Sequence, residues 1–426
     1  MEVLIYSEYS SNRFNYVLDW IFSGVSSYKI TRDFKAISEY DGPAIIYGKN
    51  EYQNNAIVVP DSGYLWKLNV DSKIPALAEV SFPLHTLSKD IFTFIFFILT
   101  RSEEYNREML DVWGRFKAEN SMAFKGQYLN VPHVDLIKIK FFDSIKKRWP
   151  SFKVPPSKFK RQITYDIDVA WAYLHRSVFR HIYGIIRDTF KKDLASLHDR
   201  WQVINHFKVD PFFTFSQLIN FHTTLGDEPA FFILMGNKSK IDRAVGLKTK
   251  AFRQLIRDLS ARYKIGLHPS KRSGSHFHIL KEEYELLGDF VGKPIKDSRQ
   301  HYLLMRFPET YRKLIELGIE NDYSMGYASK NGFRAGTCFP FKWFDVERDV
   351  CTNLTVHPFQ AMDVTFWVYG YYTPKKVLAE LEFLENECKS VGGTFTFIAH
   401  NSSFAGPGSW HKWKDIYFAF LKNENL

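Results

Sequence analysis

The chain has 426 residues, of which 45% are hydrophobic and 24% are charged, and these values exclude a disordered chain. This length is too great for one ordinary core, so we expect two domains, one of them the size of a barrel. The formal charge of +10 would suit an anionic partner, but the basic residues are spread along the chain and form no recognisable nucleic-acid motif, so we expect no nucleic-acid partner.

The cysteines and the apolar runs indicate a compartment. The three cysteines include no CxxC motif and cannot form a complete set of disulfides, which is typical of a reducing environment. Residues 1–6 have the pattern of a strand and lack the features of a signal peptide. The most apolar run, residues 91–99, is much shorter than the roughly 20 residues that cross a bilayer. We therefore expect a cytoplasmic protein without a membrane span.

Strand and helix patterns alternate in the first part of the chain. We expect strands at residues 3–6, 44–47 and 56–59, and a helix at 12–22, where apolar residues recur at helical spacing. The run at 91–99 predicts a buried helix or strand. Residues 144–160 are basic and contain three prolines, which favours a linker. We place a domain boundary near residue 155, so that residues 1–155 form a smaller α/β domain of unknown role.

The second part, residues 156–426, repeats strand and helix patterns in a way that predicts a parallel sheet or barrel. The expected strands and helices are spaced along its whole length. The strands are expected at residues 162–166, 231–235, 264–267, 301–305 and 395–399, and the helices at 178–188, 250–263, 310–317 and 374–387.

Polar residues that can do chemistry follow several of these expected strands. Asp166 and Asp168 are two residues apart on a strand, so their carboxylates share a face and can bind a cation or act as a base. His268 and His400 each end a strand and can bind metal or transfer protons. Arg334 lies between glycines and can hold a carboxylate by two hydrogen bonds. Each motif alone also suits a structural or surface role.

Together the motifs resemble those of the polysaccharide deacetylases, carbohydrate esterase family 4, over residues 160–415. The likeness lies in the order and type of six short segments, and the first 155 residues resemble the α/β domain that precedes such deacetylases in some bacterial proteins. The segments are T-Y-D-I-D at 164–168, P-A-F-F at 229–232, G-L-H at 266–268, G-I-E-N-D-Y-S at 318–324, F-R at 333–334 and I-A-H at 398–400.

This resemblance implies a distorted (β/α) barrel that binds a divalent metal, often zinc, and hydrolyses acetyl groups on a polysaccharide or acetylated sugar. By the same resemblance, Asp166 would be the general base, and Asp168 and His268 would bind the metal. Arg334 would hold Asp166 ionised, and His400 would protonate the leaving group.

Two departures from the family pattern raise questions. Ile167 separates the two aspartates, which are usually adjacent, so we expect a bulge or turn that brings both inward. The position of the family's second histidine holds Arg272, which cannot bind metal. Our candidate for the third metal ligand is His301, with His276 or His278, or no third protein ligand, as alternatives.

The departures leave a second function open. The leading hypothesis is a metal-dependent carbohydrate deacetylase. The alternative is a catalytically silent, deacetylase-like protein that binds carbohydrate. A charged cluster that includes Arg101, Glu103 and Glu104 follows the apolar run, and for it we expect a structural ion network at the domain interface.

Overall fold

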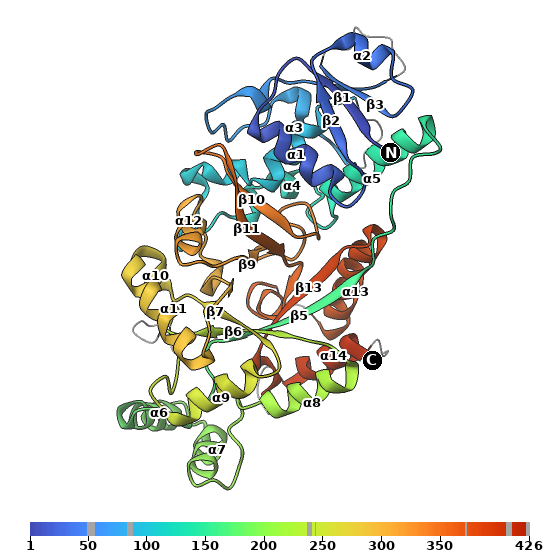
Figure 1. The fold of residues 1–426 in the computed structure, drawn as a ribbon. Helices are drawn as coiled ribbons and strands as arrows, with labels where there is room; N and C mark the ends of the chain where they lie inside the picture. Colours follow the sequence, from blue (N-terminus) through green and yellow to red (C-terminus); the bar gives the residue numbers. More distant parts are fainter. Residues whose placement is uncertain are drawn as a thin grey trace.

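The computed structural model describes residues 1–48, 56–82, 88–236, 241–242, 244–370, 373–405 and 411–422. Two sheets organise this part of the chain, and Figure 1 shows them at different ends of the molecule. Among the described residues, no helix combines the length and the apolar character that crossing a membrane requires.

The first sheet has four parallel strands in the order β2-β1-β3-β4. Its strands and helices match the expected positions closely, since all of the strands and the first helix predicted from the sequence are present. The strands are β1 (Val3–Ser7), β2 (Tyr28–Thr31), β3 (Ala44–Gly48) and β4 (Ile57–Pro60). The helices of this part are α1 (Asn12–Phe22), α2 (Phe34–Ser38), α3 (Ile91–Leu99), α4 (Met122–Lys125) and α5 (His133–Arg148).

The second sheet has nine strands and is open and curled, with the order β10-β11-β9-β8-β7-β6-β5-β13-β12. Neighbouring strands are parallel except for β10 and β11. The strands are β5 (Lys160–Ile167), β6 (Ala230–Leu234), β7 (Lys264–His268), β8 (Asp297–Ser298), β9 (Asn321–Met325), β10 (Phe341–Asp345), β11 (Val350–Pro358), β12 (Ala361–Met362) and β13 (Thr394–His400).

Helices lie between most of the parallel strands along the chain, as the crossover connections of a parallel sheet require, and α14 follows the last strand. They are α6 (Val178–Phe190), α7 (Leu194–Ile204), α8 (Phe215–Leu225), α9 (Lys250–Ser260), α10 (Lys271–Ser275), α11 (Phe277–Val291), α12 (Glu309–Glu316), α13 (Pro374–Val391) and α14 (His411–Lys422). The predicted fold class, a barrel-like α/β sheet preceded by a smaller α/β sheet, is confirmed.

The hydrophobic core is continuous between the two sheets. One cluster of buried apolar side chains includes residues of β1, α3, β5 and β13. Every residue of α3 is buried, so the most apolar run of the sequence is a core helix. The predicted boundary near residue 155 falls between α5 and β5 and stays a prediction.

One predicted strand is wrong. Residues 301–305 form no strand; instead His301–Leu303 is a short 3-10 helix, η6, in which Tyr302 has a left-handed conformation with φ of 60°. The strand lies just before it, as the two-residue β8. The apolar spacing of residues 301–305 therefore reflects burial in a tight turn and not strand alternation.

Candidate metal centre

The candidate site lies where parallel strands of the second sheet end. Asp166 of β5 is directly opposite His400 of β13, and His268 ends β7 opposite Leu234 of β6. Close packing of β6, β7 and β8 depends on Gly266, because a Cβ atom there would lie 2.5 Å from the ring of Phe232. The sheet thus brings side chains from distant parts of the sequence to one edge.

Asp166 and Asp168 point to the same side, as strand alternation predicts. Asp166 Oδ2 is 3.8 Å and Asp168 Oδ1 is 3.3 Å from His268 Nε2. The register between β5 and β13 is continuous from Lys160 to Asp166. Of the expected bulge or turn, the pairing with β13 shows no bulge; β5 ends at Ile167, and Asp168 follows in the bend directly after the strand.

Asp168, His268 and His301 form a compact cluster. Each offers one ligand atom, and these atoms lie within 4.8 Å of one another. His268 and His301 are buried, with ring centroids 4.9 Å apart. Asp168 keeps 31% of its side-chain exposure, so the cluster is reached from solvent on the side of that carboxylate.

Hydrogen bonds fix the orientation of both imidazole rings. His268 Nδ1 donates to the carbonyl oxygen of Arg299 at 2.6 Å, and a carbonyl can only accept. His301 Nδ1 donates to Asp242 Oδ1 at 2.9 Å, and the same oxygen accepts from the backbone of Lys271. Both rings therefore turn Nε2 toward Asp168, which is the arrangement that outer-shell partners give to metal-binding histidines.

The carboxylate and the two imidazoles of the cluster form a set of ligand atoms that can bind a cation. Asp168 Oδ1 is buried and has no hydrogen-bond partner among the described residues, although two imidazole nitrogens face the carboxylate at 3.3 and 3.6 Å. Because both Nδ1 atoms donate hydrogen bonds, each neutral imidazole turns the lone pair of Nε2 toward Asp168, where it can coordinate a cation. Two imidazoles and one carboxylate suit zinc, whose catalytic sites usually have three protein ligands.

The pKa values of Asp168 and His301 also reflect the attraction between the carboxylate and the imidazoles. Burial by itself would raise the pKa of Asp168, but the charge of His301 and the close imidazoles of His268 and His301 hold it well below its usual range. Burial would lower the pKa of His301, but Asp168 and Asp242 raise it to about 9. A divalent cation bound at the cluster would take the place of the proton on His301 and balance the negative charge of Asp168.

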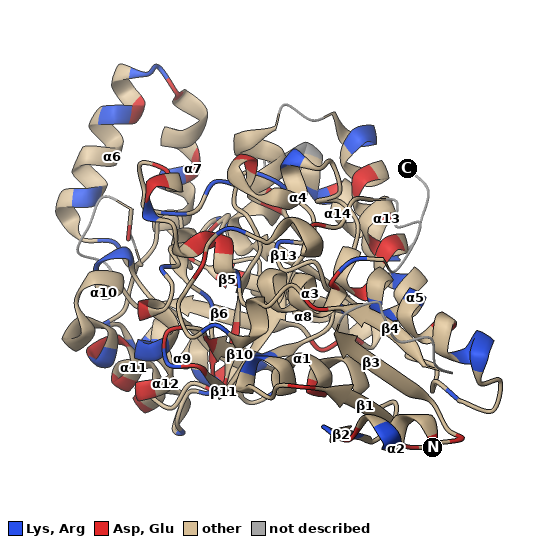
Figure 2. Ribbon diagram, turned by 90° about the horizontal axis from the view of Figure 1, so that it is seen from above, with Lys and Arg blue, Asp and Glu red and all other residues tan. Residues whose placement is uncertain are grey.

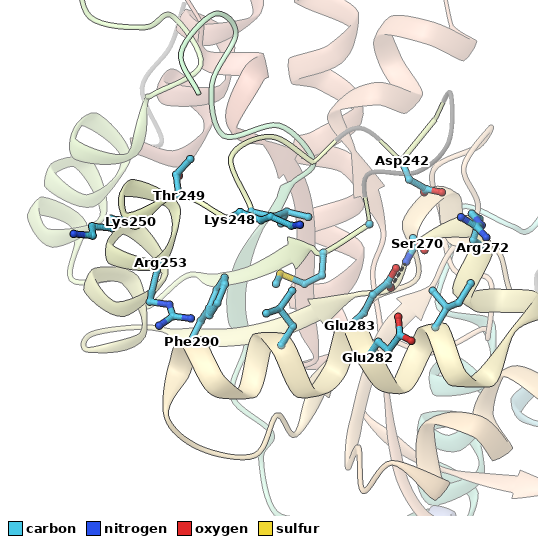
Figure 3. A pocket seen from close by; sticks show the side chains of 15 residues that line it. Asp242, Lys248, Thr249, Lys250, Arg253, Ser270, Arg272, Glu282, Glu283 and Phe290 are labelled. Atoms are coloured by element: carbon cyan, nitrogen blue, oxygen red, sulfur yellow. Dashed lines mark hydrogen bonds between the residues drawn. The ribbon is translucent and has the colours of Figure 1, made fainter. Parts of the chain in front are cut away.

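The alternative third ligands lie elsewhere. His276 and His278 are exposed and are not part of the cluster. Their ring centroids lie 5.8 Å apart. Arg272, at the position of the family's second histidine, lines a separate pocket of about 570 Å³ between α9 and α11. Figure 3 shows Arg272 there beside Ser270, whose backbone donates to Glu283.

This pocket adjoins the cluster of Asp168, His268 and His301 through Asp242. Asp242 lines the pocket and also accepts a hydrogen bond from His301. None of the other candidate site residues is among the described residues that line the pocket. Carboxylates and imidazoles converge at the cluster and not in this pocket.

The predicted contact between Arg334 and Asp166 is wrong. Arg334 is buried and pairs with both carboxylate oxygens of Glu104, while its Nη1 donates to the Gly326 carbonyl at 2.9 Å. With all three nitrogens engaged, its guanidinium is not available to Asp166. Arg299 takes the expected place, because its Nη1 lies 2.8 Å from Asp166 Oδ1 and both side chains are buried.

His400 lies on the other side of the cluster. Its Nδ1 is 2.8 Å from Asp363 Oδ1, and its Nε2 is 3.8 Å from Asp168 Oδ2. Asp363 also accepts from the backbone of His400 and from the Ser403 hydroxyl. Burial would lower the pKa of His400, but Asp363 and then Asp168 raise it to about 10, so this imidazole is protonated at neutral pH without metal.

Sequence reasoning missed three residues that support the site: Arg299, Asp242 and Asp363. Arg299 stands two positions before His301, and the same strand end that presents the histidine also presents the arginine. Asp242 lies in a loop and Asp363 in the helical turn directly after β12, neither within a recognisable motif, and only the fold places them against His301 and His400.

A family model matches the N-terminal part of the chain. Residues 3–150 match a family model described as a family of unknown function (DUF7033). No curated protein matches the chain.

Solved structures give only weak likenesses. A protein assigned as a polysaccharide deacetylase from Mycobacterium smegmatis shares 14% identity with a TM-score of 0.40, covering 63% of this chain and 86% of that one. Another so assigned, from Pseudomonas aeruginosa PAO1, shares 10% with a TM-score of 0.41, covering 71% and 90%. A mutant of BA3943, a CE4 family pseudoenzyme with restored activity, shares 9% with a TM-score of 0.32, covering 63% and 64%. Scores this low carry no argument about function.

Proposed function

We propose that this protein is a metal-dependent hydrolase that removes acetyl groups from a glycan or an acetylated sugar. The observation that carries the proposal is the convergence of Asp168, His268 and His301 between a buried carboxylate, Asp166, and an imidazole, His400. This arrangement offers a metal site, a base and an acid within one strand edge. Deacetylation needs all three, because neutral water is a poor nucleophile and the leaving amine or alcohol needs a proton.

Asp168, His268 and His301 would hold the metal, which when bound supplies Lewis acidity toward water and toward a carbonyl oxygen. Asp166 is the proposed general base. Arg299 fixes its Oδ1, and its Oδ2 faces the cluster at 3.8 Å from His268 Nε2, where it can accept a proton from an attacking water. Arg299 positions this carboxylate and keeps its buried charge compensated.

His400 is the proposed general acid. Asp363 accepts its Nδ1 proton and so directs Nε2 toward the site, which leaves Nε2 to deliver a proton to the leaving group. This pairing of an imidazole with a buried carboxylate holds one tautomer and favours the protonated ring. The acid and the base stand opposite each other on β13 and β5, with the metal ligands beside them.

Exposed aromatic rings beside the cluster support a sugar substrate. Tyr302 follows the ligand His301, and its ring lies 5.7 Å from that of Trp113 in the N-terminal part of the chain. Each of the two residues is 37% exposed. Flat apolar rings of this kind can pack against the faces of sugars. The N-terminal part would thus contribute to substrate binding.

The test is acetate release by the zinc-loaded protein from N-acetylglucosamine oligomers, an O-acetylated glycan and 4-nitrophenyl acetate. Asp166→Asn and His400→Gln are expected to lower kcat by about 10²–10⁴, the usual value of a positioned acid or base. Asp258→Asn and His278→Gln make the same chemical changes at exposed positions and should leave kcat unchanged.

Acetate release that Asp166→Asn and His400→Gln leave intact would contradict the assigned roles. Retained glycan binding without acetate release from any of the three substrates would instead favour the catalytically silent carbohydrate-binding protein.

A further inference from the structure

Helix α6 presents an apolar face to solvent. Seven apolar side chains along it are 44–86% exposed, and they occupy an arc of about 160° at 100° per residue. They are Val178, Phe179, Ile182, Tyr183, Ile185, Ile186 and Phe190. An amphipathic helix normally turns such a face toward the core, and an exposed face of this size indicates an interaction surface.

The inward face of α6 is polar, which is why the apolar face points outward. The Asp188 carboxylate is buried and pairs with Arg200 of α7 at 2.7 Å. Gly184 admits the guanidinium, since a Cβ atom there would lie 2.5 Å from Arg200 Nη2. An ion pair therefore fastens α6 to α7, and the apolar arc takes no part in this contact.

Basic side chains border the apolar arc. Arg180, Arg187 and Lys191 follow one another at intervals of seven and four residues along one edge of the arc, and all three are exposed. Lys192 continues this series beyond the helix. The one acid of the helix, Asp188, is buried and already paired with Arg187 and Arg200. Because Arg187 shares the Asp188 carboxylate with Arg200, the exposed surface of α6 combines apolar and aromatic side chains with a net positive charge.

The helix is also placed to reach a flat surface. Figure 1 shows α6 and α7 projecting from the end of the molecule that lies away from the four-stranded sheet. In Figure 2 the same helices stand at the rim, with Lys and Arg segments along α6. With 13 residues, α6 is about 20 Å long, which is shorter than the roughly 30 Å hydrocarbon core and excludes a transmembrane position.

We propose that α6 binds the surface of an anionic lipid bilayer and lies in the plane of the interface. Its apolar arc would enter the boundary between headgroups and acyl chains, and Arg180, Arg187 and Lys191 would contact the anionic headgroups. The charge decides for lipid over a second copy of this chain, because two such faces would bring like charges together. This inference is independent of the catalytic proposal, since α6 contains no site residue.

The test is cosedimentation of the full-length protein with vesicles of phosphatidylcholine, with and without phosphatidylglycerol. Binding is expected on the anionic vesicles and weaker binding on the neutral ones, with a decrease as salt is raised. The double variant Ile182→Ser/Ile186→Ser should lower binding about 10-fold, since each isoleucine is half exposed and burying the exposed half contributes about 0.75 kcal/mol.

A charge variant separates the two contributions. Arg180→Gln/Lys191→Gln should lower binding to anionic vesicles about 30-fold, at roughly 1 kcal/mol per basic residue, and leave binding to neutral vesicles unchanged. Matched controls are Leu68→Ser/Val350→Ser and Lys35→Gln/Lys281→Gln, which alter exposed residues elsewhere and should bind like the wild type.

Three outcomes would overturn the proposal. The wild-type protein could fail to sediment with anionic vesicles, or the α6 variants could bind as well as the controls. Light scattering could also show a dimer that Ile182→Ser/Ile186→Ser dissociates, without vesicle binding, and a second copy would then be the partner. All the substituted side chains are exposed, so unchanged thermal unfolding should accompany each result.

Discussion

Replacing Glu104 by glutamine tests the assignment of Arg334 to the structure and not to the catalytic site. Glu104 pairs with two buried arginines: Arg334 donates Nε at 2.9 Å and Arg101 donates Nε at 2.7 Å. All three side chains keep at most 3% of their exposure. Loss of the carboxylate would leave buried guanidinium charge uncompensated, which typically costs about 3–5 kcal/mol.

Thermal unfolding measures this cost. At about 2 °C per kcal/mol for a large domain, Glu104→Gln should lower Tm by about 6–10 °C. The control is Glu309→Gln, which removes the carboxylate of an exposed pair with Arg107 and should change stability by less than about 1 kcal/mol. Both variants should keep the metal content of the wild type, because neither residue is in the cluster.

The effect should also depend on pH. Burial would raise the pKa of Glu104, but Arg334 and Arg101 lower it below its ordinary value. A carboxyl with a lowered pKa in the folded state stabilises the protein above its unfolded pKa, and this stabilisation is lost as the pH falls. The gap in Tm between wild type and Glu104→Gln should therefore narrow in acid. Equal Tm values for Glu104→Gln and Glu309→Gln at neutral pH would contradict a structural role for the Glu104 ion pairs.

Three further predictions concern other parts of the molecule. Asp363→Asn should lower kcat for acetate release by about 10²–10⁴ with little change in KM, because His400 loses the acceptor that fixes its tautomer; an unchanged kcat would remove Asp363 from the mechanism. Trp113→Ala should raise KM about fivefold for an oligosaccharide and leave kcat unchanged, as expected for one lost aromatic contact, and equal KM values would exclude Trp113 from substrate binding. Burial lowers the pKa of His133 to about 3 in the folded protein. As the pH falls below 6.5, this histidine is protonated only in the unfolded state, so the free energy of unfolding should fall by about 1.4 kcal/mol per pH unit. Urea unfolding of His133→Gln should not show this slope.

Strand periodicity and strand ends were the parts of this protein that the sequence predicted best. Asp166 lies near the end of β5 and Asp168 directly after it, and both carboxylates face His268, as their two-residue spacing predicted. His268 and His400 follow apolar runs that are fully buried, so the position of each at a strand end followed from local pattern alone. The helix α1 was predicted with its bounds for the same reason, since a local apolar spacing decided it.

Contacts between distant segments could not be predicted in this way. Which arginine pairs with Asp166 depends on the order of strands in the sheet. Arg299, which directly follows the short β8, contacts Asp166, whereas Arg334 pairs with Glu104 in the 3-10 helix Ser102–Tyr105. The η6 turn looked like a strand because its apolar residues are buried by tertiary packing. The cluster at Arg101 to Glu104 is an ion network that joins the N-terminal part to the second sheet, as expected.

Metal content of the purified protein tests the central claim most directly. Mass spectrometry after incubation with zinc should find about one metal ion per chain in the wild type, as expected for a site with three protein ligands. His301→Ala should lose it, and His276→Ala/His278→Ala, which removes two exposed histidines outside the cluster, should retain it. Absence of bound zinc in the wild type, or equal zinc in His301→Ala, would contradict the proposed metal centre.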